Sequence, residues 1–412
     1  MVLGALSAFG PLSMDLYLPA LPDLADDLGS TEAVAQITMT ACMIGLALGQ
    51  LILGPVSDRF GRRVPLLLGV GTFAMTSLLC TLATNMGVLI ALRLVQGLAG
   101  GAGIVVARAV VRDLCDTEAA ARVFSLLVLV SGAAPVLAPV LGAQVLRFTE
   151  WRGTFVTLGV IGCALLAAAV WGVPESLPPE RRALAGVAEG RRQVGTVLRD
   201  KQFVVHTAVM ALGSTLLFCY ISMSPFVLQG EYGLSAQLFS LVFAANSVGL
   251  VLCGSLGARL VQRIGPSATL TTGLVSGVVA AVALAIATAL GAGLAVVLPL
   301  LLVAVSTVSL VQPTSTALAL THHGSRAGAA SGLIGLAQFG VGGVISPLVS
   351  LVGTTAVVMS VAMAVSVVVA LAVHQAVRRL PAPATGQPSG AAPAPPAAAD
   401  PSGPVPVCKE QR

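Results

Sequence analysis

Long apolar stretches alternate with short polar segments along the chain, and this pattern predicts twelve membrane-spanning helices. A helix needs about 20 consecutive apolar residues to cross the hydrocarbon core of a bilayer. The stretches are apolar on all sides, which excludes the period-two alternation of β-barrel strands. The predicted spans cover residues 2–24, 33–55, 64–83, 86–107, 122–146, 153–172, 203–227, 236–258, 267–289, 292–318, 328–351 and 353–375.

A polar segment over residues 173–202 separates the first six spans from the last six. We therefore expect an N-terminal six-helix half over residues 1–172, an inter-half loop, and a C-terminal half over residues 203–376. From residue 377 to 412, Pro, Ala, Gly and Ser dominate, a composition that cannot bury a core and predicts a disordered tail. The first span has neither a basic leader nor a cleavage site, so we expect it to be retained as a helix.

Charge content excludes whole classes of protein and sets the orientation. Only 9% of the residues are charged and 56% are hydrophobic, whereas a soluble domain carries about 25% charged residues. A soluble enzyme and a nucleic-acid binder are therefore excluded. Nearly all of the 22 lysines and arginines fall in loops on one side of the predicted membrane, and the other side holds Arg147 and Arg152. The positive-inside rule then predicts a multi-pass protein of the plasma (inner) membrane with both termini in the cytoplasm.

No motif indicates a metal, a cofactor or an ATP site. The histidines and cysteines lack zinc spacing, and neither Lys201 nor Lys409 completes a phosphate-binding loop. A membrane-embedded enzyme or sensor would need a nucleophile–base cluster, metal ligands or a signalling domain, and the sequence offers none. We predict no catalytic residues, no cofactor, and transport driven by a gradient or by none.

The two halves share a segment in the same register, at the end of the second span of each half and in the loop after it. The matching positions are Gly49, Gly54, Arg59 and Arg63 in the first half and Gly249, Gly254, Arg259 and Arg263 in the second. This repeat predicts a duplicated six-helix unit, and transporters built from such repeats hold their substrate near the membrane midplane.

The loop after the second span combines glycines, an acid and arginines at fixed offsets: Gly54, Asp58, Arg59, Gly61, Arg62 and Arg63. These positions resemble the G-x-x-x-D-R-x-G-R-R signature of the major facilitator superfamily. Glycines permit a tight turn and close helix approach, and an acid caps a helix or pairs with an arginine. The resemblance implies a latch for the outward-facing state, completed by Arg112 and Asp113 after the fourth span. A plain positive-inside loop is the alternative.

Two further motifs resemble those of proton-coupled antiporters within the superfamily. Their positions are Arg93, Gln96 and Gly97 on the fourth span and Pro135, Pro139 and Gly142 on the fifth. Prolines bend a helix and small residues let it pack closely, so a purely structural kink is the alternative for the fifth span. Ala138 stands where that motif usually has a glycine.

Three further segments indicate a particular branch of this superfamily. They are D-x-Y-L-P-A-L-P from Asp15 to Pro22, R-A-V-V-R-D ending at Asp113, and P-E-S-L-P over residues 174–178. They resemble the Bcr/CflA-type drug:proton antiporters. The resemblance implies an all-α major facilitator fold, twelve transmembrane helices in two six-helix halves, that exports small drug-like compounds in exchange for protons.

Asp15 and Arg93 are the ionisable residues inside the predicted spans. Burying one costs about 2.5–3.5 kcal/mol, so each is a functional candidate. At about 1.5 Å per residue, both lie at similar depth, and we expect one shared polar site. Asp15 is the predicted proton carrier, and Arg93, which does not deprotonate, is its counter-charge or a substrate anchor. A static ion pair that fixes helix packing is the alternative.

The expected substrate contacts are polar residues of both halves: Tyr17, Gln96, Asn246, Gln312 and Gln338. The predicted function is proton-coupled efflux of small amphipathic compounds of the chloramphenicol or bicyclomycin kind. The expected partners are a small-molecule substrate, protons and the lipid bilayer, with no nucleic acid, and the expected state is a monomer. A metabolite exporter or an uptake symporter on the same fold is the alternative.

Overall fold

The computed structural model describes residues 2–7, 9–114, 117–178, 180, 182, 194–321 and 327–378, and helices dominate this part of the chain, which contains no β-strand. The elements are α1 (Val2–Ser7), α2 (Phe9–Asp15), η1 (Leu18–Ala20), α3 (Leu21–Asp27), α4 (Glu32–Phe60), α5 (Arg63–Cys80), α6 (Met86–Leu114), α7 (Thr117–Val145), α8 (Trp151–Gly172), α10 (Lys201–Pro225), η3 (Phe226–Glu231), α11 (Ala236–Ile264), α12 (Pro266–Ala289), α13 (Leu294–Leu320), α14 (Ala327–Ser350) and α15 (Ala356–Arg378).

The helices fit the predicted set of twelve membrane crossings. Within the described residues, ten helices are long and apolar enough to span a membrane, and α7 contributes a shorter apolar segment, Gly132–Val145. The first predicted span is broken into α1, α2 and α3. The predicted tail lies outside the described residues, apart from the end of α15, as does much of the predicted inter-half loop.

Several helices extend beyond their predicted ends. α4 continues to Phe60, α6 to Leu114 and α11 to Ile264. Hydropathy detects only the part of a helix that is embedded in the hydrocarbon core, and these helix ends lie beyond it. Backbone hydrogen bonding continues through the polar residues that follow, because arginine and serine are compatible with a helix in water.

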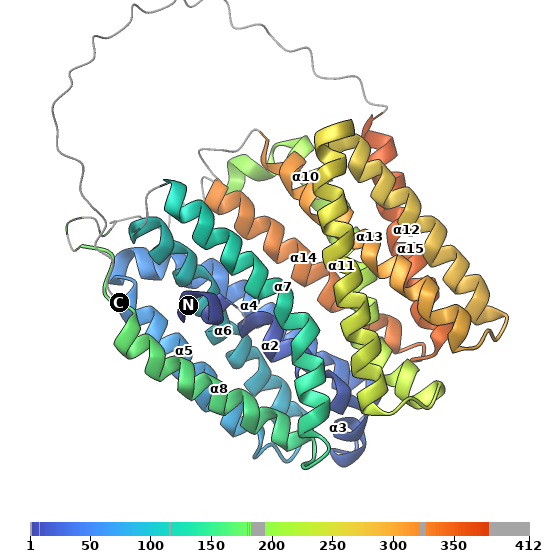
Figure 1. Ribbon diagram of the computed structural model, residues 1–412, viewed down its shortest axis with the longest axis horizontal. Coiled ribbons are helices and arrows are strands. Elements are labelled where there is room, and N and C mark those ends of the chain that lie inside the picture. The colour runs from blue at the N-terminus through green and yellow to red at the C-terminus, as the bar shows by residue number, and fades with distance from the viewer. Residues whose placement is uncertain are drawn as a thin grey trace, which may run out of the picture.

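Figure 1 shows the N-terminal helices gathered in one bundle and α10–α15 in a second beside it. α4 packs against α14 and α7 against α11, so these two helix pairs form the seam between the bundles. The turn between α4 and α5 marks the end of the molecule that the sequence predicts to be cytoplasmic; the other end is called the predicted outer end.

Hydrogen bonds across the seam gather toward the predicted outer end. Four of them, among the described residues, join Ser350 Oγ to Gln36 Oε1 (2.7 Å), Thr40 Oγ1 to the Gly343 carbonyl (2.5 Å), Gln229 Nε2 to the Pro19 carbonyl (3.2 Å) and Gln237 Nε2 to the Ala143 carbonyl (3.4 Å). All four are neutral pairs. The two halves are therefore held together at this end by hydrogen bonds that a salt change does not screen.

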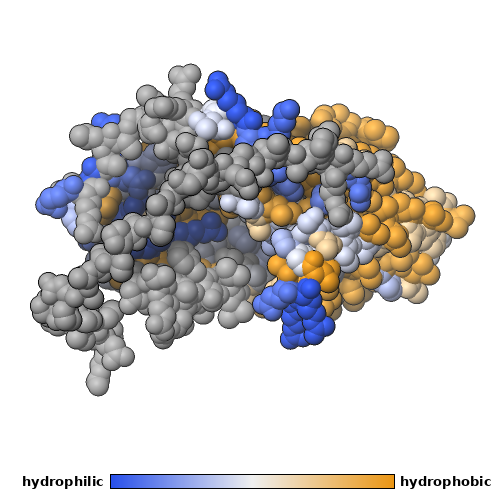
Figure 2. Space-filling view, turned by 90° about the horizontal axis from the view of Figure 1, so that it is seen from above, coloured by the Kyte–Doolittle hydropathy of each residue, from blue (hydrophilic) through white to orange (hydrophobic). Residues whose placement is uncertain are grey.

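The surface matches a protein embedded in lipid. Large apolar side chains such as Leu68, Leu252 and Val279 are about two-thirds exposed on the flanks of α5, α11 and α12. Figure 2 looks onto one end of the bundles, where hydrophilic side chains collect, while hydrophobic residues cover the flank on the side of α12 and α15. Contiguous exposed apolar surface of this kind needs an apolar solvent.

Glycines set the closest helix contact in the N-terminal half. On α6, Gly97 faces the carbonyl of Cys42; on α4, Gly45 faces the carbonyl of Leu94. A β-carbon at either glycine would overlap the facing carbonyl oxygen. Small residues permit such backbone approach between membrane helices, where dispersion contacts replace the hydrophobic effect as the source of association.

We expect Gly97→Ala to lower the free energy of unfolding by about 1–3 kcal/mol, because the added methyl meets a backbone that cannot move aside. Thermal unfolding of the purified protein in detergent measures this change. The matched control is Gly335→Ala on α14, where an added β-carbon has nothing within 4 Å. Equal unfolding temperatures for the two variants would contradict the packing argument.

Candidate functional site

The first membrane segment is interrupted in its middle. α2 ends at Asp15, Leu16 and Tyr17 form a turn, and η1 follows with Pro19. The carbonyls of the last helical turn have no partner within their own helix, and inside a membrane such groups must be satisfied by neighbouring protein. The break therefore places backbone and side-chain polar groups where the two halves meet.

Arg93, from the N-terminal third of α6, stabilises this break and is fully buried. Its Nη2 donates to the Ser13 carbonyl (2.8 Å) and its Nη1 to Gln96 Oε1 (2.5 Å). The guanidinium lies over the rings of Tyr17, 4.4 Å from the centroid, and Phe155, at 5.6 Å. Cation–π contacts of about 2 kcal/mol occur where the cation is desolvated. Arg93 thus ties α2 to α6 and α8 without a carboxylate.

Further hydrogen bonds orient these partners. Gln96 Nε2 donates to Ser77 Oγ on α5 (2.6 Å), and the hydroxyls of Tyr17 and Thr38 on α4 are 3.0 Å apart. Arg93 Nε has no partner among the described residues. Tyr17 and Gln96, which the sequence predicts as substrate contacts, are therefore both engaged with the Arg93 side chain, and one donor of that side chain is left for water or substrate.

Asp15 faces away from this cluster. It is 5% exposed, and the described residues contain neither an ion pair nor a hydrogen bond to its carboxylate. The η1 segment that follows it contacts α10 and α11 of the other half, which places Asp15 beside the seam. The Ser13 hydroxyl points to Cys42 Sγ of α4 (3.7 Å), and two residues further along α2 a side chain points to roughly the opposite side of the helix. No ion pair joins Asp15 to Arg93 among the described residues.

α7 reaches the break through the residues of its predicted motif. A β-carbon at Gly142 would overlap the carbonyl of Leu16, so this position requires glycine. Pro139 has no amide hydrogen to donate to the Pro135 carbonyl, four residues earlier in the helix. That carbonyl accepts a hydrogen bond from the Ser247 hydroxyl of α11 (3.3 Å). Pro139 lies between them, buried in the same helix. The motif therefore contacts both Asp15's segment and the other half.

The remaining predicted substrate contacts lie apart. Asn246 is 2% exposed and bonds to Tyr220. Gln312 of α13 is half-buried and donates to Ser214 Oγ of α10 (3.0 Å), and Gln338 is half-buried on α14. The structure thus places Asn246 at the seam, next to Ser247, which bonds to the Pro135 carbonyl of α7, and holds Gln312 within the C-terminal bundle.

Arg62 is the centre of the predicted latch. Its side chain is nearly buried and contacts Asp58 (2.5 Å), Asp113 at the end of α6 (2.8 Å) and Ser57 Oγ (2.8 Å). Asp113 also accepts from Ser176 Oγ (3.1 Å), beyond α8. A guanidinium that binds two carboxylates fixes the ends of α4, α6 and α8 relative to one another.

Other predicted latch residues have separate contacts. Arg59 lies over the Phe60 ring, 5.4 Å from its centroid, and Arg63 Nη2 donates to the Val170 carbonyl (2.8 Å). Arg112 is exposed, and the described residues give it no ion pair. A β-carbon at Gly54 would make only ordinary contact with a Val105 methyl, at 3.5 Å. Arg62 and Arg63 therefore connect helices of the latch to one another, whereas Arg112 makes no such connection among the described residues.

Glu175 also belongs to this site, although its motif predicts no separate role for this residue. Its carboxylate accepts the backbone amides of Arg62 (2.8 Å) and Arg63 (3.2 Å), the otherwise unpaired start of α5. Gly61 has φ +91°, and a β-carbon there would overlap Glu175. Burial opposes ionisation, but hydrogen bonds from Leu177, Arg62 and Arg63 and the nearby Arg182 hold the pKa of Glu175 below its ordinary value. An acid just past a helix end, near an arginine-rich turn, is the signal that identifies such a cap.

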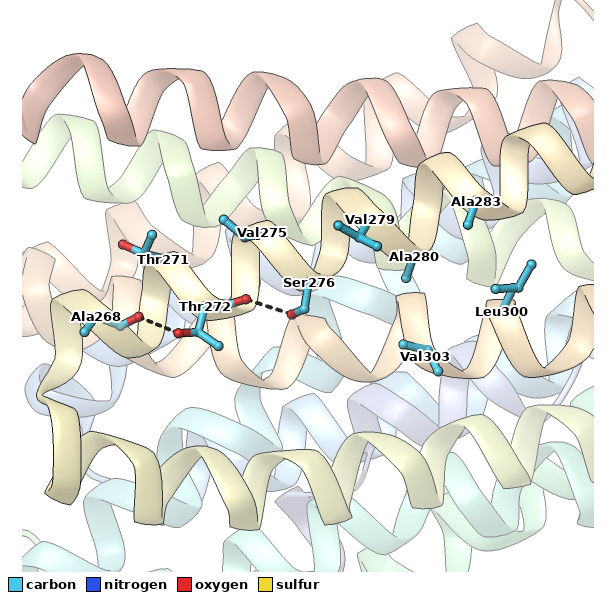
Figure 3. Close-up of a pocket in the computed structure, with 10 residues that line it drawn as sticks. All are labelled: Ala268, Thr271, Thr272, Val275, Ser276, Val279, Ala280, Ala283, Leu300 and Val303. Atoms are coloured by element: carbon cyan, nitrogen blue, oxygen red, sulfur yellow. Dashed lines mark hydrogen bonds between the residues drawn. The ribbon is translucent and has the colours of Figure 1, made fainter.

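A cavity of about 770 Å³ lies elsewhere, between α12 and α13. Figure 3 shows its lining of apolar side chains with the hydroxyls of Thr271, Thr272 and Ser276. The hydroxyls of Thr272 and Ser276 donate to carbonyls of their own helix, at Ala268 and Thr272. It contains none of the predicted site residues and is open toward the flank of the bundle, so it is not the centre of the site.

Comparison with known proteins establishes the family. The model of the Major Facilitator Superfamily matches residues 3–347. The chain therefore belongs to the Major Facilitator Superfamily, as its motifs predicted, and it is a membrane transporter rather than an enzyme.

Similar proteins with names indicate a branch within the superfamily. The chain is 35% identical over 364 residues, 88% of its length and 90% of the relative, to the uncharacterized MFS-type transporter YdgK of Bacillus subtilis. It is 31% identical to a bicyclomycin resistance protein homolog of Haemophilus influenzae (66% of this chain, 69% of the relative). It is 30% identical to a chloramphenicol resistance protein of Pseudomonas aeruginosa (66% and 64%). These names support the drug-antiporter branch that the motifs predicted.

Solved structures confirm the predicted fold. A mutant of the nucleoside transporter NupG has a TM-score of 0.73 at 14% identity, covering 91% of this chain and 99% of that one. An inward-facing, occupied bacterial homolog of the human lysosomal transporter Spinster has a TM-score of 0.72 at 16% identity, covering 92% and 96%. At such identities the likeness concerns the fold alone.

We expect Arg93→Lys to abolish most transport while the protein still inserts. A lysine cannot bind Ser13 and Gln96 together and stack flat on Tyr17, so the free energy of unfolding should fall by about 2 kcal/mol. Arg147→Lys is the matched control, because Arg147 makes the same two kinds of contact, with Gln144 and Phe148, at an exposed position. Transport and thermal unfolding of both variants are compared; equal behaviour would contradict a structural role for the buried guanidinium.

We expect Glu175→Gln to lower the free energy of unfolding by about 1 kcal/mol at neutral pH, because a neutral amide caps α5 more weakly. A carboxylate whose pKa is lowered by folding stabilises the protein above its unfolded pKa, near 4.5, and loses that effect as the pH falls below it. The difference from wild type should therefore vanish in acid. Thermal unfolding across pH tests this, with the exposed Glu180→Gln as control; a difference that persists well below pH 4.5 would contradict it.

Proposed function

We propose that this transporter is a proton-coupled antiporter that exports small amphipathic, drug-like compounds. The observation that carries the proposal is the Asp15 carboxylate, which is buried at a helix break beside the seam and has no hydrogen bond or ion pair among the described residues. An ionisable group inside a membrane span is costly and marks an ion or substrate pathway. A carboxylate without fixed partners takes up and releases a proton without dismantling the structure around it.

Arg93 has a different role in this proposal from the one its sequence suggests. It does not neutralise Asp15 by contact; it holds the Ser13 carbonyl and the Tyr17 ring, and so fixes the segment that carries Asp15. Its permanent charge also favours an ionised carboxylate or an anionic substrate group nearby. Protonation of Asp15 and binding of substrate then compete at one place, which produces exchange.

The two bundles supply the conformational change. We propose that residues 1–172 and 203–376 rock against each other as halves, with both termini in the cytoplasm and one chain as the working unit. The seam hydrogen bonds toward the predicted outer end would open, while the Arg62 contacts keep α4, α6 and α8 together within one half. Rigid motion of repeats about a central site is the general mode of such transporters.

The resistance names of the relatives support a drug-like substrate, and the stacked Tyr220 and Phe243 rings at the seam support an amphipathic one. A substrate of this kind partitions into apolar pockets and needs few oriented polar contacts.

We expect Asp15→Asn to abolish substrate-dependent proton release from inverted membrane vesicles while substrate binding persists, because an amide binds no proton at working pH. The measurement is the change in internal pH on adding chloramphenicol to energised vesicles. Asp23→Asn, an exposed acid of α3, is the control and should behave as wild type. Normal exchange by Asp15→Asn at normal expression would overturn the carrier role, and a pH change of opposite sign in wild type would indicate uptake by symport.

A further inference from the structure

A compact polar and aromatic cluster of the C-terminal half lies at the seam, where α10 and α11 contact the η1 segment that follows Asp15. Tyr220 of α10 and Asn246 of α11 are 1% and 2% exposed, and Asn246 Nδ2 donates to the Tyr220 hydroxyl (2.9 Å). The Tyr220 and Phe243 rings stack with centroids 5.4 Å apart and an angle of 18°. Phe243 and Asn246 lie on the same face of α11. The stack fixes the orientation of the hydroxyl and of the amide.

The hydrogen-bonding capacity of this cluster is not filled. Asn246 Oδ1 is buried and has no partner among the described residues. The Tyr220 oxygen accepts from Asn246, so its own hydrogen is left to donate, and the described residues provide it no acceptor. Buried polar groups are almost always paired with protein, water or a ligand. The cluster therefore presents one acceptor and one donor side by side.

The position of the cluster is the seam between the halves. Ser247, the neighbour of Asn246, donates to the Pro135 carbonyl across the seam, and α10 and α11 both contact η1, which follows Asp15. A molecule bound at Asp15 is thus adjacent to the free donor and acceptor.

The charge of the C-terminal half decides what chemistry the cluster recognises. Between residues 203 and 378, Glu231 is the one acidic residue, and its carboxylate accepts the backbone amide of Ala356 at the start of α15 (2.6 Å). No carboxylate from this half is therefore available for a cationic substrate. A hydroxyl or amide group, which both donates and accepts, matches a donor and an acceptor held side by side.

We propose that Tyr220 and Asn246 form a specificity subsite for an uncharged substrate, whose hydroxyl or amide group donates to Asn246 Oδ1 and accepts from the Tyr220 hydroxyl. This inference rests on the proposed function only in taking the Asp15 region as the transport site. Asn246 and Tyr220 bind substrate; they carry no proton. Their removal weakens binding and leaves the proton exchange of each completed cycle unchanged.

The test is equilibrium binding to the purified full-length protein, with chloramphenicol as an uncharged probe that carries hydroxyl and amide groups and tetraphenylphosphonium as a cation without donors. Tyr220→Phe and Asn246→Leu should each weaken chloramphenicol binding about tenfold, the effect of one lost buried hydrogen bond. Tyr232→Phe removes a matched hydroxyl, which bonds to the Ala292 carbonyl outside this cluster, and should leave binding unchanged.

Asn246→Asp adds the missing carboxylate and should strengthen binding of tetraphenylphosphonium while weakening that of chloramphenicol. If Asn246→Leu fails to fold, Tyr220→Phe, which removes a single oxygen atom, still tests the subsite. Wild-type affinity for chloramphenicol in Tyr220→Phe and Asn246→Leu would overturn the subsite, as would a wild-type protein that binds the cation alone or neither probe.

Proton exchange is measured separately, so the two proposals can fail independently. Weakened binding in these variants together with unaltered exchange in Asp15→Asn contradicts the proposed coupling and supports the subsite. Unchanged binding in the variants together with lost exchange in Asp15→Asn supports the coupling and contradicts the subsite.

Discussion

The hydrogen bond from Arg93 to the Ser13 carbonyl is the interaction on which the site depends. A helix that ends inside a membrane leaves carbonyl groups without water to bind them, and an unsatisfied group there costs several kcal/mol. Arg93 supplies the donor, and Tyr17 and Phe155 supply aromatic faces that partly replace the hydration of its charge. Because the break is stabilised in this way, Asp15 can end a helix in the middle of the bundle and face the second half.

Close backbone approach follows from the same constraint. Gly142 lets α7 approach the turn at Leu16. Gly97 lets α6 approach α4 near Cys42, and this close packing places Arg93 beside the break. In water, a bulkier pair of helices would still associate through the hydrophobic effect. In lipid, association depends on dispersion contacts and hydrogen bonds, so these positions cannot accept a side chain without displacing a helix.

At the predicted cytoplasmic end, charge has the organising role that small residues have within the membrane. Arg62 joins Asp58 and Asp113, and Glu175 caps α5 while Gly61 leaves room for its carboxylate. Water and salt reach this end, so its contacts are individually modest and act as a network. The seam near the opposite end is held by neutral hydrogen bonds. The two ends of the transporter therefore respond to different conditions, the first to pH and salt and the second mainly to the competition of water for its hydrogen bonds.

The sequence by itself determined the membrane class, the twelve helices and the family, because these depend on hydropathy and on short motifs, both of which are local. It also identified Asp15 and Arg93, since charge inside an apolar span stands out without any knowledge of its neighbours. Only the tertiary structure decided what these residues face. Depth along two helices does not determine the direction of a side chain around each axis, and in the structure Arg93 bonds to the Ser13 carbonyl instead of the Asp15 carboxylate. The cap by Glu175 on α5 was decided in the same way, because residues far apart in the chain meet only when α8 packs against α5.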